Sequence, residues 1–441
     1  MIRERRKLCP VKMEYSRLLD EKVIVTLCKE LKLNKDQIYY SEAPLSMSFI
    51  SQIRDKLHGK KDLFYVRRVP QNSRYVRSSL SMMEQIEAGD ILLSYPFESM
   101  QPFIRLLNEA GENEKVVSIK MTLYRVAKNS QIVEALINAA ESGKEVVVLV
   151  ELRARFDEEN NIEWSRRLED AGCRIIYGID HIKVHSKLCL ITYCDGTEVK
   201  HITQIGTGNY NEQTAKLYTD LSLMTANQDI AEEAAQVFNR LCMAQVMEET
   251  HHLLVAPKCL QNRVLDFIEE EIHHADNNEP AYIGVKMNSL TDKTIIDKMV
   301  EASQHGVKID LVVRGICCLI PGIEGYTENI KVISIVGRYL EHSRIYIFGT
   351  PERDKMFISS ADFMTRNMVK RVEVATPIYD TAIKDRVRTM FGIMLHDTVK
   401  GRELCRDGNY YRREKPQEES EVISSQAYFS NEAYLAASKN V

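Results

Sequence analysis

The stretch HIKVHSKLCLI at residues 181–191 carries two histidines and two lysines at alternating positions, just ahead of an apolar run. These side chains are His181, Lys183, His185 and Lys187. Histidine and lysine in this pattern could form a metal site, supply a nucleophile, or lie along a basic edge strand that has no chemical role. The segment alone leaves all three interpretations open.

A second copy of the pattern lies farther along the chain. Residues 117–152 can be aligned with residues 282–315, and both copies continue to a strand-like segment with a histidine, KVHSKLCLI in one and LEHSRIYIF in the other. In these segments His185 is followed by Lys187, and His342 by Arg344. Because alternate residues of a strand point to the same face, each histidine is predicted to stand beside a permanent cation. The repeat indicates two duplicated domains whose histidines meet at one cleft.

A metal site is disfavoured by the predicted strand. His181 and His185 are four residues apart, a spacing that places two ligands together on a helix. On a strand, four residues span roughly 13 Å, which is too far to share one ion. We therefore assign His181 and Lys183 to the loop that leads into the strand.

A reaction at phosphorus fits the histidine–cation pairs better. A neutral imidazole is a nucleophile, and a neighbouring cation both disfavours its protonation and binds the oxygens of the phosphoryl group. We predict that His185 is the nucleophile and that Lys187 and Arg344 are catalytic cations. His342 is predicted to hold or protonate the leaving group.

Further cations follow the predicted strands, where open α/β sheets bind their ligands. Arg125, Arg153 and Arg155 follow strands of the first repeat, and Arg314 follows a strand of the second. We expect them to bind phosphate.

Each copy also continues to a turn-like segment, IGTGN at residues 205–209 and SSADF at residues 359–363. The glycines of the first could form an anion-binding nest or a plain tight turn. The matching place in the repeat favours a site role, so Asn209 and Asp362 are candidate phosphate-binding residues.

The elements that must position these side chains follow an alternating order. From about residue 115, apolar strand-like runs alternate with amphipathic segments, which predicts an α/β fold with mixed sheets flanked by helices. We expect a partial helical domain at residues 1–71, catalytic domains at 72–252 and 253–400, and a weakly ordered polar C-terminal tail at 401–441.

Composition limits the class of protein. The chain has 441 residues, of which 44% are hydrophobic and 28% charged, and its net charge is −4. This charge gives no general attraction to nucleic acid or anionic membranes. The ten cysteines form no CxxC pair, and no apolar run reaches the ~20 residues of a membrane-spanning helix. We expect a cytoplasmic protein without nucleic-acid partners, and any membrane association would be peripheral.

The two histidine motifs resemble those of the phospholipase D superfamily. More narrowly, residues 72–400 are similar to polyphosphate kinases of the long, histidine-phosphorylated type. The stretches that carry the likeness are MTLYRVAKNSQIVEALINAAESGKEV, ELRARFDEENNIEWSRRLEDAG, KVHSKL, IGTGNYNEQTAKLYTDLSLMT, YLEHSRIYIF and SSADFMTRNMVKRVEVATPI. The resemblance implies two tandem phospholipase D-like domains that transfer the γ-phosphoryl group of ATP reversibly to inorganic polyphosphate through a phosphohistidine.

The resemblance also implies roles for single residues. His185 aligns with the phosphorylated nucleophile, and His342 with a second catalytic histidine that contacts ATP. Tyr218 and Arg314 align with nucleotide-binding positions. Arg125 and Arg155 align with positions assigned to a Mg²⁺–phosphate site. Arginine has no lone pair to give a cation, so we expect these two to bind phosphate oxygens beside the Mg²⁺.

The chain departs from the family pattern in three ways. Residues 1–71 resemble only the end of the family's second domain, so we expect an N-terminally truncated member that lacks adenine contacts and the contacts of the family's homo-oligomer. Gln204 stands where a histidine is common, and LLSYPFESM replaces a His-His-Pro-Tyr run. These departures bear on nucleotide affinity and assembly.

Two other functions stay open. A phosphodiesterase of the phospholipase D type would share the nucleophile but pass the group to water or an alcohol, and the additional arginines disfavour it because a diester carries less charge than a triphosphate. A truncated chain could also bind polyanions without turnover. Labelling with γ-labelled ATP, or cleavage of a bis-ester, separates the three.

Overall fold

A computed structural model describes residues 8–57, 59–151, 158–414, 416, 418 and 422–438. The chain divides into two compact units, Met1–Arg68 and Val69–Val441. Among the described residues, no helix is long and apolar enough to cross a membrane.

The first unit is small and mixes helices with a short parallel sheet. Its described residues form the helices α2 (Glu21–Leu31) and α3 (Phe49–Lys56), with single 3₁₀ turns η1 (Lys35–Gln37) and η2 (Lys61–Leu63). Strands β1 (Met13–Tyr15) and β2 (Ile38–Tyr40) pair in parallel. Asp20 accepts a hydrogen bond from the Lys22 amide and so begins α2 as its N-cap.

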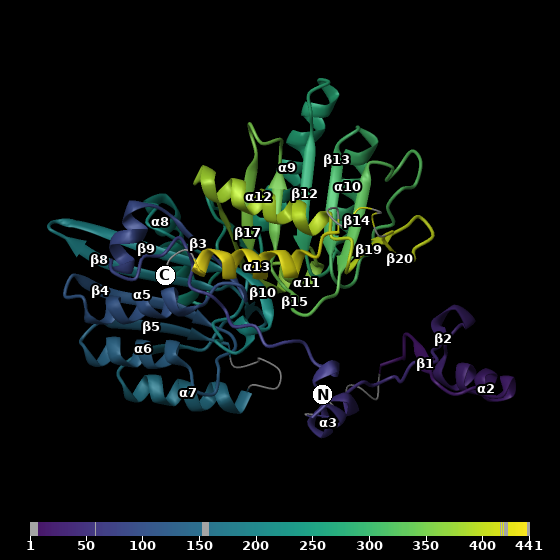
Figure 1. Ribbon diagram of the computed structural model, residues 1–441, viewed down its shortest axis with the longest axis horizontal. Helices are drawn as coiled ribbons and strands as arrows, with labels where there is room; N and C mark the ends of the chain where they lie inside the picture. Colours follow the sequence, from purple (N-terminus) through teal and green to yellow (C-terminus); the bar gives the residue numbers. More distant parts are fainter. Residues whose placement is uncertain are drawn as a thin grey trace. The chain divides into compact units, whose positions relative to one another are not determined.

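The first α/β domain of the second unit carries one mixed sheet. Its strands are β3 (Ile91–Tyr95), β4 (Val116–Leu123), β5 (Glu145–Val150), β6 (Arg174–Ile176), β8 (Leu188–Asp195), β9 (Glu198–Gly206) and β10 (Tyr218–Thr225). Its helical segments are α4 (Met82–Ala88), α5 (Gln101–Glu112), α6 (Gln131–Glu141), α7 (Glu158–Asp170), η3 (Thr214–Lys216) and α8 (Gln228–Cys242). Helices cover both faces, with α5, α6 and α7 together on one side (Figure 1).

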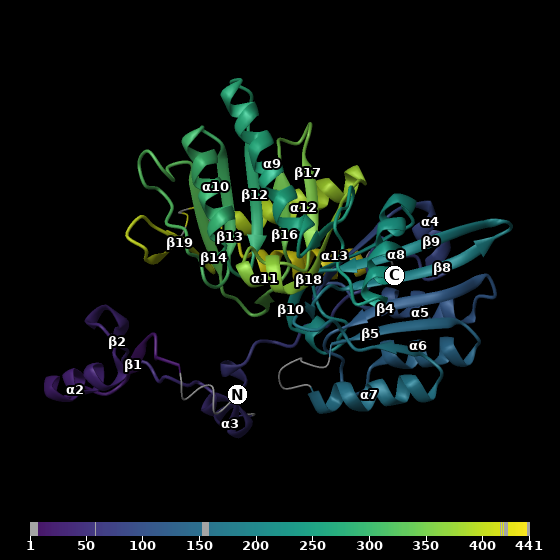
Figure 2. The same ribbon diagram turned by 180° about the vertical axis from the view of Figure 1, so that it is seen from behind.

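The second α/β domain has the same plan. Its strands are β11 (Leu254–Ala256), β12 (Tyr282–Met287), β13 (Lys308–Val313), β14 (Ile330–Ile335), β16 (Ile345–Phe348), β17 (Lys355–Ser359), β18 (Arg371–Pro377), β19 (Gly401–Leu404) and β20 (Tyr410–Arg412). Its helices are α9 (Cys259–Asp276), α10 (Lys293–Gln304), α11 (Thr365–Lys370), α12 (Thr381–Leu395) and α13 (Ser425–Ser438). Helices α9 and α10 cover the face of the sheet that is turned toward the viewer in Figure 2. Helices α12 and α13 cover the other face, which is turned toward the viewer in Figure 1.

The strand orders confirm the predicted duplication. The first sheet runs β10-β9-β8-β4-β5-β6, and the second runs β18-β17-β16-β12-β13-β14. In both, the central strands linked by a helix are parallel, while the three strands after the histidine segment are antiparallel. The predicted pair of tandem α/β domains with mixed, helix-flanked sheets is therefore confirmed.

Each domain contributes a short strand that pairs with a strand of the other domain. Strand β7 (Lys183–Val184), which leads to His185, pairs in parallel with β18 of the second domain. Strand β15 (Leu340–Glu341), which leads to His342, pairs in parallel with β10 of the first domain. The exchange brings each histidine to the last strand of the other domain's core sheet.

Apolar packing holds this arrangement in place. One buried cluster joins Leu92, Leu221 and Leu223 of the first domain to Ile345, Ile358 and Phe391 of the second. Another joins Val184, Leu188 and Ile205 to Val372 and Val374. Burial of apolar surface stabilises by roughly 25 cal/mol per Å², so a core shared by two domains fixes their relative position.

The C-terminal region corrects one expectation. We predicted weak order for residues 401–441, but the described residues there form β19, β20 and α13. Strand β19 pairs with β14, and α13 buries Phe429 and Ala433 in the core shared by the two domains. Polar composition misled the prediction because two apolar side chains of α13, Phe429 and Ala433, are enough to join it to the shared core, while Leu435 of the same helix stays exposed.

Candidate active site

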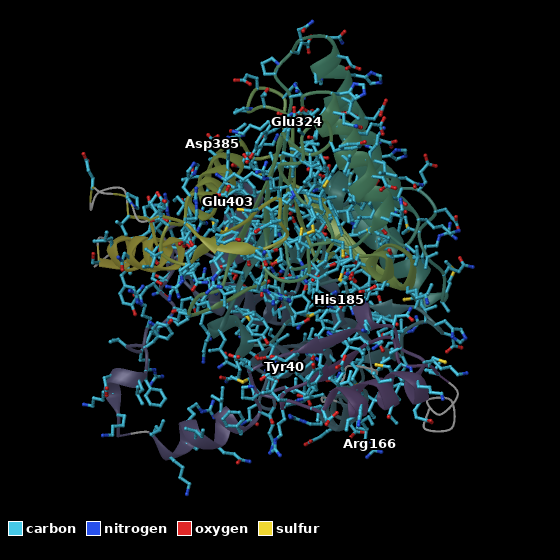
Figure 3. The ribbon with its side chains drawn as sticks, turned by 90° about the vertical axis from the view of Figure 1, so that its right-hand side faces the viewer. Tyr40, Arg166, His185, Glu324, Asp385 and Glu403 are labelled. Atoms are coloured by element: carbon cyan, nitrogen blue, oxygen red, sulfur yellow. The ribbon has the colours of Figure 1, made fainter. Side chains whose placement is uncertain are left out.

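His185 lies at the junction of the two domains, between β7 and β8 (Figure 3). The backbone amides of His185 and Ser186 donate to the carbonyl of Val372 in β18. The next residue of β18 is Glu373, whose Oε2 lies 2.9 Å from His185 Nδ1. His185 is 8% exposed and Glu373 is buried, so the first domain's histidine is oriented by a carboxylate of the second.

His342 has the mirror arrangement. It lies between β15 and β16, and its backbone amide donates to Thr219 Oγ1 at 3.1 Å. Its Nδ1 is 2.8 Å from Oδ1 of Asp220, the next residue of β10. The second domain's histidine is therefore oriented by a carboxylate of the first.

A hydroxyl group holds each carboxylate. Thr207 Oγ1 donates to Asp220 Oδ1 at 2.6 Å, and Ser360 Oγ donates to Glu373 Oε2 at 2.5 Å. Asp220 also requires its neighbour to be glycine, because a Cβ on Gly208 would lie 2.1 Å from Asp220 Oδ2. The predicted glycine-rich turn thus serves to admit a buried carboxylate.

These contacts set the protonation of both histidines. Burial opposes ionisation of Asp220 and Glu373, but the bonded histidine and nearby cations hold the pKa of each carboxyl below its usual range. Burial lowers the pKa of His185 to about 3 against the opposing pull of Glu373, and it lowers that of His342 as well. An ionised carboxylate at Nδ1 requires a proton there, so the neutral ring presents the Nε2 lone pair for attack.

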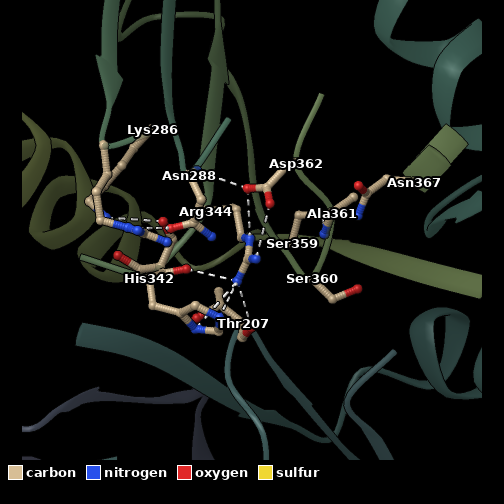
Figure 4. Close-up of polar contacts among 12 residues, drawn as sticks. Thr207, Lys286, Asn288, His342, Arg344, Ser359, Ser360, Ala361, Asp362 and Asn367 are labelled. Carbon is tan, nitrogen blue, oxygen red and sulfur yellow. Dashed lines mark hydrogen bonds and ion pairs between the residues drawn. The ribbon is translucent and has the colours of Figure 1, made fainter. Parts of the chain in front are cut away.

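The predicted catalytic cations are buried beside the histidines. Lys187 is 1% exposed, and its Nζ donates to the carbonyl of His185. Burial lowers the pKa of Lys187 to about 7. Arg344 Nη1 donates to the carbonyl of His342 at 2.8 Å and to that of Thr207 at 3.2 Å, as Figure 4 shows. Arg344 therefore joins the two domains at the site.

The surroundings of Asp362 do not suit its predicted role in phosphate binding. Its two carboxylate oxygens accept from Nε and Nη2 of Arg344 at 3.1 and 3.3 Å, and Oδ1 accepts from the Asn288 amide at 2.8 Å. An ionised carboxylate repels phosphate, and cations hold the pKa of this one below its usual range despite burial. We assign Asp362 to holding Arg344.

Asn209 occupies the matching place in the first repeat. It is half-buried, and its buried Oδ1 has no hydrogen-bond partner among the described residues. Its role in phosphate binding stays a prediction.

One aromatic ring borders each histidine. The ring of Tyr124 lies edge-on to His185 with the centroids 4.9 Å apart, and the ring of Tyr218 lies 5.3 Å from that of His342. Lys187 and Arg125 both lie over Tyr124, at 5.4 and 5.7 Å from its centroid. Tyr218, which the sequence analysis assigned to the nucleotide, therefore borders the second histidine, and Tyr124 was not predicted.

Arg314 also lies at the site. Its Nε donates to the carbonyl of Glu341 at 2.6 Å and to Asn288 Oδ1 at 3.2 Å. Glu341 immediately precedes His342 and forms a buried ion pair with Lys286 at 3.0 Å. The predicted strand-end arginine is therefore fixed to the backbone that carries the second histidine.

A cavity of about 390 Å³ opens near His185, and we call it the first basic pocket. It is lined by Tyr124, Arg125, His181, Lys183, Arg366, Lys370 and Arg371. Sequence reasoning placed Arg125 at the site but assigned His181 and Lys183 to a loop, and it missed the three cations of the second domain. Strand β7 pairs with β18 and sets Lys183 opposite Arg371. This pairing explains why Lys183 lines the same pocket as the cations of the second domain.

Arg153 and Arg155 lie outside the described residues. Gln204 is buried in β9, where its Nε2 donates to Ser222 Oγ at 2.9 Å and its Oε1 accepts from Tyr210. Its amide thus satisfies two buried hydroxyl groups within the first sheet.

The orienting acids escaped the sequence analysis although a signal was present. Asp220 in YTDLSL and Glu373 in RVEVAT are each a lone acid inside an apolar strand. They also lie at matching places of the repeat, one on β10 and one on β18. A charged residue in a buried strand needs a partner, so the match could have identified both.

The chain is similar to known proteins over most of its length. Polyphosphate kinase C-terminal domain 1 matches residues 81–247, and polyphosphate kinase C-terminal domain 2 matches residues 253–426. A polyphosphate kinase of Bacillus anthracis is 45% identical over 394 residues, which cover 89% of this chain and 56% of that protein. One of Staphylococcus epidermidis is 44% identical over 434 residues, covering 98% of this chain and 59% of that protein.

A solved structure is also similar. The crystal structure of polyphosphate kinase from Porphyromonas gingivalis matches with a TM-score of 0.82 and 33% sequence identity, covering 97% of this chain and 65% of that one. The chain therefore spans less than two thirds of the length of these relatives.

Proposed function

The chain belongs to the polyphosphate kinase family, and from this premise we propose that it transfers the γ-phosphoryl group of ATP to the end of an inorganic polyphosphate chain. The transfer is reversible and passes through a phosphohistidine at His185. The observation that carries this proposal is the buried neutral His185, oriented through Nδ1 by Glu373 and bordered by a pocket of cations.

The first step is attack on the γ-phosphorus of ATP. Nε2 of His185 forms a bond to phosphorus, and the bond from phosphorus to the β–γ bridging oxygen breaks, so ADP leaves with that electron pair. In the second step a terminal oxygen of polyphosphate attacks the phosphohistidine. The nitrogen–phosphorus bond then breaks, and the chain grows by one phosphate.

His342 and the cations act on the phosphates. The approach of negative phosphates raises the pKa of His342, which allows its Nε2 to take up a proton and donate it to a phosphate oxygen. Lys187, Arg344 and Arg125 neutralise charge that builds on the transferred group. Tyr218 and Arg314 border the same histidine, which supports their assignment to the nucleotide.

The charge of the site favours this reaction over diester cleavage. The first basic pocket contributes Arg125, Lys183, Arg366, Lys370 and Arg371. A triphosphate or a polyphosphate end carries several negative charges, whereas a diester carries one. A pocket lined by several cations therefore suits a triphosphate or a polyphosphate end better than a diester.

Magnesium is proposed as the cofactor, bound through the substrate. No group of three histidine, cysteine or acidic side chains that could hold a metal occurs among the described residues. Arg125 cannot ligate a cation, so the residues present do not form a protein cage for the ion. Mg²⁺ commonly binds nucleotide phosphates and water with few protein ligands, and we expect it to enter with ATP.

The direct test is product formation. The protein is incubated with γ-labelled ATP and Mg²⁺, and the products are separated by polymer length. Label in long, acid-labile polymer supports the proposal. Cleavage of a bis-ester without polymer would favour a phosphodiesterase, and binding of polyphosphate without either product would leave only a polyanion-binding protein.

A further inference from the structure

A second cavity of about 490 Å³ lies at the far edge of the second sheet. Strands β14, β19 and β20 lie side by side there (Figure 1). We call it the second basic pocket and define it by Arg314, Ser334, Lys400, Arg402 and Arg412 among its lining residues. None of the described residues that line it is acidic.

The strand register concentrates positive charge on one face. Ser334 of β14 is directly opposite Arg402 of β19, which is directly opposite Arg412 of β20. Directly opposed residues project from the same face, so the two guanidinium groups are neighbours. Like charges in this position destabilise a sheet unless an anion lies between them.

The acidic residue of this edge lies on the other face. Glu403 follows Arg402 in β19 and therefore points the opposite way, where it pairs with Lys331 at 3.9 Å and Arg413 at 3.8 Å. By contrast, Lys400, Arg402 and Arg412 are exposed, and none forms an ion pair within the described part of the chain. The sheet therefore separates Lys331 and Arg413, which pair with Glu403, from the three exposed cations of the pocket.

Arg314 connects this pocket with the active site. It lines the cavity, and its Nε is bound to the carbonyl of Glu341, the residue before His342. A chain of phosphates that runs outward from His342 therefore passes Arg314 before it reaches Lys400, Arg402 and Arg412.

We propose that the second basic pocket binds the part of a linear polyphosphate chain that lies away from the reacting end. This inference rests on the proposed function and adds a subsite to it. A nucleoside triphosphate offers the same phosphate chemistry, but it is short. An inorganic polymer carries negative charge along its whole length, so it can occupy Arg402 and Arg412 while its end stays at the histidines.

Equilibrium binding tests the subsite without turnover. The variant K400Q/R402Q/R412Q removes three exposed charges, and K293Q/K308Q/K355Q removes three exposed charges elsewhere in the second domain as a matched control. Dissociation constants are measured by calorimetry for long-chain polyphosphate, tripolyphosphate and ATP. Thermal unfolding of each variant shows that it folds.

The pocket variant is expected to bind long-chain polyphosphate on the order of ten-fold more weakly, with tripolyphosphate and ATP changed less than about two-fold. The control triple variant should bind all three ligands as the unchanged protein does. Equal long-chain affinity in the pocket variant and the control would overturn the proposal, and so would an equal loss of ATP affinity, which would assign the pocket to the nucleotide. Absence of polymer synthesis by the unchanged protein would contradict the proposed function and leave these binding constants interpretable.

Discussion

Asp220 and His342 belong to different domains, yet their side chains are hydrogen-bonded at 2.8 Å. Glu373 and His185 repeat the relationship in the opposite direction at 2.9 Å. Neither catalytic histidine therefore pairs with a carboxylate of its own domain. The exchanged strands β7 and β15 are the structural cause, because each places a histidine next to the last core strand of the other domain.

Replacing the orienting acid should damage chemistry more than folding. Glu373→Gln keeps the shape but cannot fix the proton on His185 Nδ1, so the rate of histidine phosphorylation should fall by roughly 10²- to 10⁴-fold. Rapid-quench measurement of acid-labile label gives this rate. The conservative Arg371→Lys, which changes a neighbouring residue of β18 and keeps the charge, is the control and should lose far less. A normal labelling rate in Glu373→Gln would show that the carboxylate does not orient the nucleophile.

Phosphorylation should depend on pH through Lys187 rather than through His185. The pKa of His185 is lowered to about 3, so the ring stays neutral across the range from pH 5 upward, and no loss of rate is expected near pH 6.5. The pKa of Lys187 is lowered to about 7, so its charged fraction falls as pH rises through that value. The second-order rate constant at low ATP should therefore fall above about pH 7.

Lys187→Arg provides the matching test, because a guanidinium group stays protonated throughout this range. Its alkaline loss of rate should disappear, even if the rate at pH 6 is lower than that of the unchanged protein. Lys187→Met should be slow at every pH. If the unchanged protein and Lys187→Arg lose rate at the same pH, Lys187 is not the group that titrates.

Gly208→Ala should inactivate the site by displacing Asp220. The added Cβ would lie 2.1 Å from Asp220 Oδ2, which must move and take the support of His342 with it. A displacement of about 1 Å at a catalytic group can cost about 10²-fold in rate. Gly392→Ala in α12, where nothing lies within 4 Å of the added Cβ, is the control and should keep full activity. Equal activities of the two variants would contradict the tight approach of Asp220 to Gly208.

The C-terminal helix should stabilise the segment that precedes His342. Gln426 of α13 donates to the Tyr339 carbonyl at 2.9 Å and to Glu341 Oε1 at 2.6 Å, and it accepts from the Tyr339 amide at 2.9 Å. Gln426→Ala leaves these buried groups without their partner and should lower the free energy of unfolding by about 1–3 kcal/mol. Urea unfolding measures this change. Asn431→Ala, on the exposed side of the same helix, should change it little, and a similar loss in both variants would refute the specific role of Gln426.

Local patterns in the sequence predicted much of the fold. Alternation of strands and helices, and the match between KVHSKLCLI and LEHSRIYIF, identified two duplicated domains and selected His185 and His342. These features depend only on short stretches of chain, which explains why they could be read directly. The cations Lys187 and Arg344 were selected from an expected strand period, but this expectation was wrong, because residues 185–187 lie between β7 and β8 and residues 342–344 lie between β15 and β16.

The exchange of strands between domains could not be read in this way. Strand β7 consists of Lys183–Val184 and β15 of Leu340–Glu341, and segments this short carry no periodicity. Their pairing depends on the packing of two whole domains. The roles of Arg371 and Asp362 therefore became visible only in three dimensions. The polar region after residue 401 was misjudged for the same reason, because β19 and α13 form through contacts distant in sequence.

The central claim is that His185 carries the phosphoryl group, and mapping the label tests it most directly. The protein is mixed with γ-labelled ATP and Mg²⁺, quenched in base to preserve phosphohistidine, digested and sequenced by mass spectrometry. We expect one acid-labile phosphate on the peptide that contains His185, and none in His185→Ala, whose folding is checked by thermal unfolding because the change leaves the buried Glu373 without its partner. Label that persists in His185→Ala, or that maps to His342 in the unchanged protein, would contradict the account.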